Sequence, residues 1–189
     1  MNLIVAITGA TGAYTAKLLM EKAPWPVALV ISPWGQDVYE RECGDIEDLK
    51  SRAAAVYDNE DLSAPIASGS VPTAGMVVLP CSANTMGKIA SGHADTLITR
   101  AAQCHLKERR RLILCVRESP WSSIQLDAAR TVSGAGGIIM PLSPPFYMFA
   151  DQDPKAVTAH TLLDLYADRV LALLGQPSDH NWETASGTP

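Results

Sequence analysis

The sequence has few of the residues that build metal centres or cross-links. Its 189 residues include four cysteines and four histidines, with no CxxC pair and no HExxH motif. Structural zinc sites and disulfide frameworks depend on such spacings, so we expect neither, and no bound metal. Cys115 lies in the apolar run LILCV and is predicted to be a small core residue.

Long apolar runs are also missing. No segment approaches the roughly 18 apolar residues that a membrane-spanning helix requires, so we expect no membrane partner. The opening residues, MNLIVAITGATG, lack the basic region of a signal peptide and predict a strand instead. Together these features favour a cytoplasmic protein.

Positive charge is scarce. The chain has 15 Lys and Arg against 20 Asp and Glu, a formal net charge of −5, whereas nucleic-acid-binding domains are normally basic. We therefore expect no nucleic-acid partner. The charges are unevenly placed: acids concentrate between Asp37 and Asp61, and bases between Arg100 and Arg117. Apolar residues make up 47% of the chain, which excludes a disordered protein.

Short apolar runs alternate with helical patterns along the chain. The predicted strands are 3–8, 27–31, 76–79, 112–116 and 137–140. The predicted helices are 14–22, one that begins at 32–33, 83–91, 97–109, 122–132 and 154–174, with a loop over 58–73. Continuously apolar strands that alternate with helices are typical of a parallel sheet covered on both faces. The sequence therefore predicts a single doubly wound α/β domain over residues 1–175, Rossmann-like or flavodoxin-like with a mainly parallel sheet, and a polar tail over 176–189.

Two predicted strands end in small or polar residues that suit a phosphate. The first strand is followed by Gly9-Ala10-Thr11-Gly12, and the third by Ser82-Ala83-Asn84-Thr85. Glycines let the backbone approach a ligand, and a helix N-terminus offers free N–H groups to an anion. A plain tight turn and an ordinary helix cap explain these two segments equally well.

The bases offer a third signal. Arg117-Glu118 directly follows a buried strand, where an arginine fork can hold phosphate and a carboxylate can orient it or move a proton. Tyr147 and Arg169 could add contacts, whereas the run from Lys107 to Arg111 is typical of a solvated helix end. The residues thus predict a binder of a phosphorylated ligand: a flavin mononucleotide protein, a phosphotransfer enzyme or a nucleotide-binding module.

Several segments, taken in order, resemble one known family. They are 8–12 (TGATG), 65–70 (PIASGS), 79–85 (LPCSANT), 97–102 (LITRAA), 106–110 (LKERR), 116–120 (VRESP) and 145–147 (PFY). This set resembles the flavin prenyltransferases of the UbiX/Pad type, within the flavin-binding decarboxylase-like superfamily. The family commonly has Ser in place of Thr11.

The resemblance implies a reaction and a set of site residues. FMN would be bound by Gly9, Ala10, Thr11, Ser32, Ser82, Ala83, Asn84, Thr85 and Arg117. Dimethylallyl phosphate would be held by Lys107, Arg117, Glu118, Tyr147 and Arg169. The family joins a dimethylallyl group to N5 and C6 of reduced FMN without a metal, with Glu42, Glu118 and Thr11 as the implied catalytic positions here. Its product is the cofactor of a UbiD-type decarboxylase, and its members are homododecamers with sites at subunit interfaces.

The chain also departs from the family pattern. The family's His-Leu-x-Asn-Met segment is replaced by residues 124–129 (IQLDAA), and residues 148–151 (MFAD) replace a proline-containing loop. These departures keep an alternative open, an FMN-dependent oxidoreductase of the dihydromethanopterin-reductase type on the same scaffold, and so does a simple FMN-binding module. A cysteine-decarboxylase-like enzyme would need a His after the first helix, and no His lies near 14–34.

Overall fold

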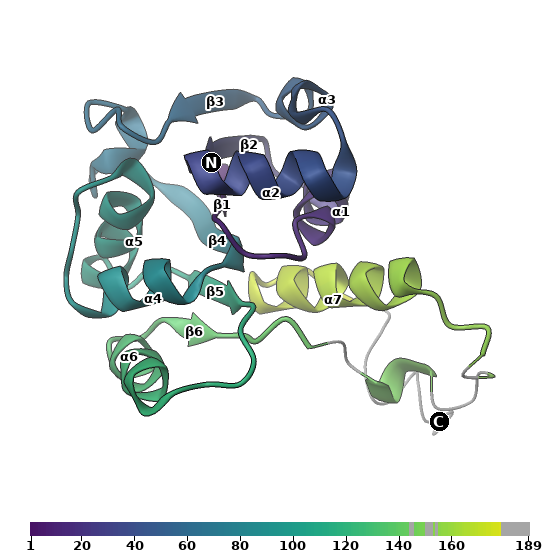
Figure 1. The fold of residues 1–189 in the computed structure, drawn as a ribbon. Coiled ribbons are helices and arrows are strands. Elements are labelled where there is room, and N and C mark those ends of the chain that lie inside the picture. The colour runs from purple at the N-terminus through teal and green to yellow at the C-terminus, as the bar shows by residue number, and fades with distance from the viewer. Residues whose placement is uncertain (144–145, 150–152, 154, 179–189) are drawn as a thin grey trace.

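The computed structural model describes residues 1–143, 146–149, 153 and 155–178. Six parallel strands form one sheet in the order β3-β2-β1-β4-β5-β6 (Figure 1). The strands are β1 (Asn2–Ile7), β2 (Val27–Ile31), β3 (Ala55–Asp58), β4 (Thr73–Cys81), β5 (Leu112–Val116) and β6 (Ile138–Ile139). The order reverses between β1 and β4, as in Rossmann-like rather than flavodoxin-like sheets, and ligands bind at such a reversal.

Helices cover both faces of the sheet in this single α/β domain. The helices are α1 (Tyr14–Lys22), α2 (Pro33–Cys43), α3 (Ile46–Ser51), α4 (Ala83–Ala90), α5 (Leu97–Lys107), α6 (Ser123–Gly134) and α7 (Ala159–Leu173), with short 3₁₀ turns η1 (Pro65–Ala67) and η2 (Phe146–Phe149). Helices α1 and α7 pack together on one side, and α4, α5 and α6 lie on the other (Figure 1).

The alternation of side chains along β1 explains the two cores. Leu3, Val5 and Ile7 face the core under α1 and α7, while Ile4 and Ala6 face the core under α4 and α5. All five side chains are fully buried. Successive strand residues point to opposite faces, so a strand covered on both sides must be apolar throughout.

The predicted order of elements is confirmed, with corrections. Helix α1 and strands β2 and β5 have the predicted bounds, but β4 is longer than 76–79 and β6 shorter than 137–140. The prediction missed α3 and the edge strand β3, so the described residues form six strands where five were predicted. The last helix begins at Ala159, because the Thr158 hydroxyl caps it by accepting from the Thr161 amide. Pro154, Pro145, Ala150, Asp151 and the tail from 179 to 189 lie outside the described residues.

Candidate functional site

A cleft of about 240 Å³ lies at the carboxyl ends of the strands, where the strand order reverses. Its lining residues are Thr8, Gly9, Ser32, Trp34, Asn59, Ser82, Asn84, Thr85, Lys88, Thr96, Ile98 and Thr99. These residues follow β1, β2, β3 and β4 or begin α2, α4 and α5. None of these lining residues is acidic, and Lys88 is the one basic residue, paired with Asp95 at 2.6 Å.

Two helices begin at this cleft with a serine cap. The Ser32 hydroxyl accepts from the Gly35 amide at 3.0 Å, and the Ser82 hydroxyl accepts from the Thr85 amide at 3.2 Å. Ser82 is therefore a helix cap, which is one of the two roles that the sequence leaves open for this segment. Helix N-termini carry unpaired N–H groups and partial positive charge, so α2 and α4 together favour an anion in the cleft.

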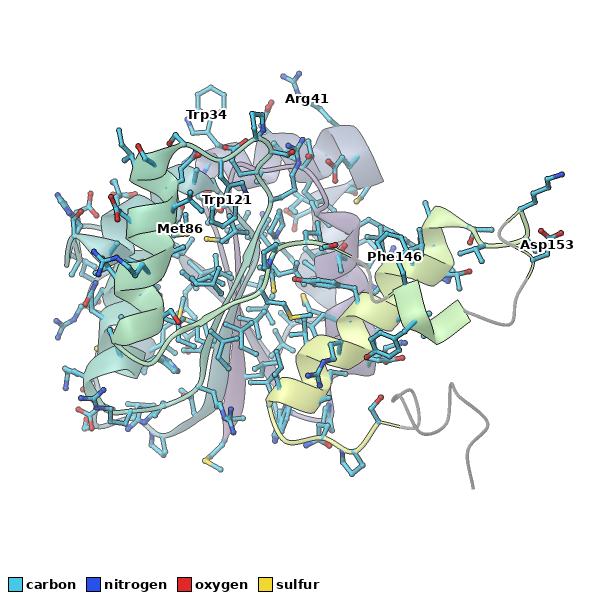
Figure 2. The ribbon with its side chains drawn as sticks, turned by 90° about the horizontal axis from the view of Figure 1, so that it is seen from below. Trp34, Arg41, Met86, Trp121, Phe146 and Asp153 are labelled. Carbon is cyan, nitrogen blue, oxygen red and sulfur yellow. The ribbon has the colours of Figure 1, made fainter. Side chains whose placement is uncertain are left out.

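The segment from Gly9 to Gly12, here called the glycine loop, is closely packed. A Cβ atom on Gly9 would lie 2.6 Å from the Trp34 Cβ, and Gly12 has a φ of +98°. Trp34 itself projects outward from the rim of the cleft and is 74% exposed (Figure 2). Gly9 is therefore required by the close approach of Trp34, and Gly12 by its backbone conformation.

Glu42 binds this loop from the end of α2. Its carboxylate accepts from the Gly12 amide at 2.9 and 3.0 Å and from the Ala13 amide at 2.7 Å. A carboxylate at these amides satisfies N–H groups that the start of α1 leaves unpaired. Both ends of α2 thus lie near the end of β1, one at the cleft and one at the glycine loop.

Arg117 and Glu118 follow β5 at the same edge of the sheet. The Arg117 Nε donates to the Thr11 hydroxyl, which links the glycine loop to the end of β5. The half-buried Glu118 carboxylate accepts from the Ser119 amide at 3.1 Å and from the Gln125 Nε2 at 3.5 Å. The structure therefore brings Thr11, Glu42 and Arg117 together, with Glu118 adjacent.

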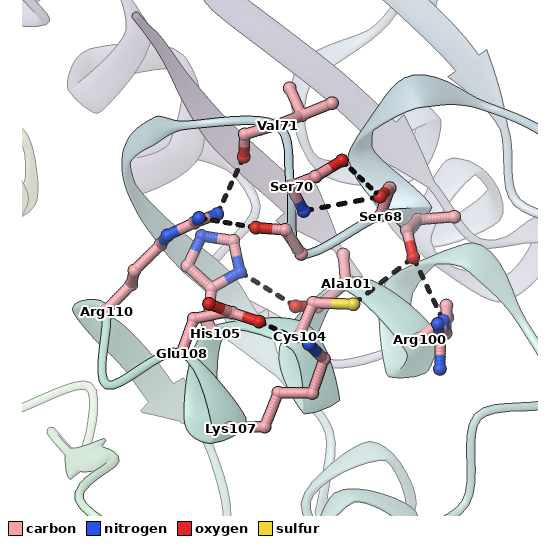
Figure 3. Close-up of polar contacts among 12 residues, drawn as sticks. Ser68, Ser70, Val71, Arg100, Ala101, Cys104, His105, Lys107, Glu108 and Arg110 are labelled. Atoms are coloured by element: carbon pink, nitrogen blue, oxygen red, sulfur yellow. Dashed lines mark hydrogen bonds and ion pairs between the residues drawn. The ribbon is translucent and has the colours of Figure 1, made fainter.

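Lys107 lies at the opposite edge of the sheet. Helix α5 begins at the carboxyl edge, where Asn59 accepts from the Leu97 amide, and it ends at Lys107 before β5 begins. Five strand residues, about 16 Å of chain, separate that edge from Arg117. Lys107 pairs with Glu108 against the loop of residues 68–70 (Figure 3), and a Cβ on Gly69 would lie 2.6 Å from the Lys107 Nζ.

Arg169 and Tyr147 also lie away from the cleft. Helix α7 runs alongside α1: His160 contacts Tyr14 at the start of α1, and Asp168 pairs with Lys22 at its end. The exposed Arg169 follows Asp168, about 13 Å along the helix from His160. Tyr147 lies on η2, beyond the sheet on the α7 side (Figure 1).

Several residues of the cleft were not predicted from the sequence. Thr8 and Asn59 each follow a strand directly and are buried, and Thr96 and Thr99 form a capping box at the start of α5. The backbone carbonyl of Asn59 accepts from the Leu97 amide, and its side-chain Oδ1 accepts from the Ile98 amide. Asn59 therefore connects the start of α5 to the end of β3. The general rule that polar residues at strand ends face the ligand would have found Thr8.

Two of the cysteines, Cys81 and Cys115, are fully buried in the core. Burial raises the pKa of Cys115 to about 12 and raises that of Cys81 strongly, so both remain thiols; the predicted core position of Cys115 is confirmed. No cluster of three metal-ligating side chains occurs among the described residues. Within the same residues, no helix has the length and apolar character needed to cross a membrane.

Comparison with known proteins identifies the family. The Flavoprotein family model matches residues 1–169. A flavin prenyltransferase UbiX from Thermoplasma acidophilum is 41% identical over 181 residues, covering 95% of this chain and 97% of the relative. The chain belongs to the UbiX-type flavin prenyltransferases. The resemblance found in the sequence motifs is thereby confirmed.

Solved structures of UbiX-type proteins have the same fold. AnUbiX (PadA1), in complex with FMN and dimethylallyl pyrophosphate, superposes with a TM-score of 0.86 at 36% identity, covering 93% of this chain and 92% of the other. A dodecameric FMN-dependent UbiX-like decarboxylase from Escherichia coli O157:H7 gives a TM-score of 0.85 at 35% identity, covering 93% and 96%.

Proposed function

We propose that the chain binds FMN and joins a dimethylallyl group, taken from dimethylallyl phosphate, to N5 and C6 of the reduced flavin. One observation of the structure carries this proposal. The cleft at the strand-order reversal faces two serine-capped helix N-termini, has no acidic side chain among its described lining residues, and lies beside the linked pair Arg117 and Thr11.

The cleft fits the phosphate of FMN. Ser32, Ser82 and Thr85 offer hydroxyls at the starts of α2 and α4, where N–H groups and the helix dipoles favour a doubly charged anion. Gly9, Ala10, Thr11, Ala83 and Asn84 complete the set of proposed flavin contacts. The reduced flavin supplies the two nucleophilic atoms that accept the prenyl group.

Arg117 is the cation best placed to hold the phosphate of the prenyl donor. Its guanidinium is exposed at the edge of the sheet, and its Nε is already fixed by Thr11. A guanidinium fork binds phosphate oxygens in a defined geometry and stabilises the charge that develops as the phosphate departs. Thr11 would then orient both the arginine and the leaving group.

The remaining proposed phosphate contacts come from other copies of the chain. Lys107 and Arg169 lie toward the amino edge of the sheet, and the length of β5 separates Lys107 from Arg117. A single chain therefore cannot place these cations on one phosphate. A homo-oligomer, proposed here to be a dodecamer, would bring Lys107, Arg169 and Tyr147 of neighbouring subunits to the site.

Proton transfer requires a carboxylate that can release its present partners. Both oxygens of Glu42 accept from the amides of the glycine loop, so protonation of Glu42 would break contacts that shape the loop. Glu118 has one amide contact and one long contact to Gln125. The geometry favours Glu118 as the group that takes up the flavin proton, with Glu42 holding the loop.

Mass analysis of the flavin product tests the proposal. The protein is incubated anaerobically with reduced FMN and dimethylallyl phosphate, and in parallel with the pyrophosphate. A flavin heavier by one prenyl unit supports the transferase, and its use by a UbiD-type decarboxylase identifies the recipient. An unchanged flavin, together with flavin turnover driven by NADH and a pterin, would instead establish the oxidoreductase. The cytoplasmic location stays a prediction from the sequence.

A further inference from the structure

Gln125, in the first turn of α6, makes contacts with both ends of its side-chain amide. Its side-chain Oε1 accepts from the backbone N–H of Ser122 at 2.7 Å. In return, the Ser122 hydroxyl accepts from the backbone N–H of Gln125 at 3.3 Å. This reciprocal pair is a capping box, which satisfies two amides at the start of the helix. Gln125 belongs to the segment 124–129 in which the chain departs from its family.

The capping box determines which end of the amide faces Glu118. An amide group has an acceptor oxygen and a donor nitrogen, and the hydrogen-bond network decides their assignment. Because the Ser122 amide needs an acceptor, the oxygen of Gln125 must point to it. The Nε2 is left facing the Glu118 Oε2, at 3.5 Å.

The short loop between Glu118 and α6 supports this arrangement. The Trp121 Nε1 donates to the Glu118 carbonyl at 2.8 Å, which closes the loop onto the backbone of Glu118. The other carboxylate oxygen accepts from the Ser119 amide at 3.1 Å. Within the described residues, both polar contacts of this carboxylate are thus to uncharged donors, and the neighbouring Arg117 side chain is directed to Thr11.

We propose that Gln125 is a positioning residue that orients the Glu118 carboxylate for its part in prenyl transfer. The inference rests on the proposed function, because it is the prenyl-transfer reaction that would use Glu118. A capping box accepts Glu or Gln equally at this position, so the helix alone does not require an amide. Only the amide offers a donor to Glu118, whereas a glutamate would place a second negative charge opposite it.

Three variants separate orientation from helix capping. Gln125→Glu keeps the acceptor for the Ser122 amide but replaces the donor toward Glu118 with a carboxylate oxygen. Ser122→Ala is the matched control, because it removes half of the capping box and leaves the Gln125 contact to Glu118 in place. Gln125→His tests rescue, since an imidazole N–H can also donate to Glu118.

The pH profile of prenyl transfer is the first measurement. Two facing carboxylates hold a proton to higher pH, so Gln125→Glu should move the acid limb of kcat/KM upward by roughly one pH unit or more. Ser122→Ala should lower the thermal midpoint without moving that limb. Gln125→His should recover most of kcat at about pH 7 or above. Superposable profiles for wild type and Gln125→Glu would overturn the proposal.

A stability cycle gives a readout that does not depend on catalysis. Gln125→Glu should lower the thermal midpoint at about pH 8, and adding Glu118→Gln should restore it, because the like-charge repulsion disappears. If the two substitutions are coupled but the protein makes no prenylated flavin, the proposed function is refuted, whereas the contact between Gln125 and Glu118 is supported. The absence of coupling would overturn the inference even in an active enzyme.

Discussion

Thr8 and Ser82, which follow neighbouring strands, share a hydrogen bond: the Ser82 amide donates to the Thr8 hydroxyl at 2.8 Å. The same hydroxyl donates to the Pro80 carbonyl at 2.9 Å, and Thr8 is 2% exposed. A buried side chain thus fixes the residue that caps α4. Because α4 begins at the cleft, the almost fully buried Thr8 helps to position part of the proposed phosphate site.

We expect Thr8→Val to weaken both the fold and FMN binding. The substitution leaves the part-buried Ser82 amide without its acceptor, and losing the partner of a fully buried amide costs about 1–3 kcal/mol, which sets the upper limit. Thermal unfolding and FMN titration measure the two effects, and Thr8→Ser, which keeps the hydroxyl, is the control. Equal stability of Thr8→Val and Thr8→Ser would show that the hydroxyl has no such role.

We expect Gly9→Ala to weaken FMN binding by about tenfold or more, since its Cβ would lie 2.6 Å from the Trp34 Cβ and the glycine loop would have to move. Gly87→Ala is the matched control, because Gly87 lies within α4 and a Cβ there meets no atom within 4 Å. That control should gain about 0.5–1 kcal/mol of stability and bind FMN normally. Equal affinity of both variants would contradict the expectation.

Glu42→Gln should leave FMN bound but slow prenyl transfer. An amide has one acceptor oxygen in place of two, so it holds the Gly12 and Ala13 amides less well, and the glycine loop that carries Thr11 loses its position. Misplacement of reacting groups by about 1 Å can lower turnover by about 10²-fold. Stopped-flow or product-mass kinetics measure this, and unchanged turnover would remove Glu42 from the mechanism.

Lys107→Ala and Arg117→Ala should each be inactive alone and regain activity when the two chains are assembled together. In a random mixture, about one quarter of the sites would combine an intact Arg117 with an intact Lys107 from a neighbour. The prenylation rate of co-expressed chains measures this, and the double variant mixed with wild type is the control. No recovery in mixed oligomers would mean that Lys107 does not act across an interface.

Stability should fall as the pH is lowered through about 6.5. Burial lowers the pKa of His105, whose Nδ1 bonds the Ala101 carbonyl and whose Nε2 bonds Thr73, and the Arg110 guanidinium lowers it further. The unfolded chain therefore takes up a proton near its ordinary value of about 6.5 while the folded protein does not. The loss is at most about 1.4 kcal/mol per pH unit.

Unfolding midpoints in urea at about pH 8 and about pH 5.5 measure this dependence. His105→Gln is the comparison, because it cannot titrate and should lose less stability between the two conditions. If both proteins lose the same stability between the two pH values, the pH dependence comes from the carboxylates and not from His105.

Elements buried on both faces could be predicted from the sequence, and partly exposed ones could not. The continuous apolar runs of β1, β2 and β5 are the direct result of burial between two helical layers. Strand β3 alternates between half-buried and exposed positions at the edge of the sheet, so its four residues carry little signal. Helix α3 is six residues long and is recognisable mainly from the cap that Asp45 makes with the Glu47 amide.

The site shows the same division. Ser32, Ser82 and the glycine loop could be placed at one edge of the sheet because each follows a strand directly. Family resemblance places Lys107 in the same phosphate site as Arg117. Sequence spacing does not reveal that α5 carries Lys107 to the opposite edge of the sheet from Arg117. The sequence indicated which residues matter, whereas only the fold shows which of them one chain can bring together.

The separation of Lys107 from Arg117 by the length of β5 has a genetic consequence. If each site draws cations from different chains, the effect of a defective copy on its normal neighbours depends on which cations it has lost. A chain that lost Lys107 alone would not inhibit its normal neighbours, because every intact lysine still completes one site and the mutant chain offers its own Arg117. A chain that lost both Lys107 and Arg117 would act as a dominant negative in a cell that expresses both alleles, since assembly mixes the chains and separates normal lysines from normal arginines. A gene duplicate that keeps the interface but loses both residues would therefore inhibit the enzyme from which it arose.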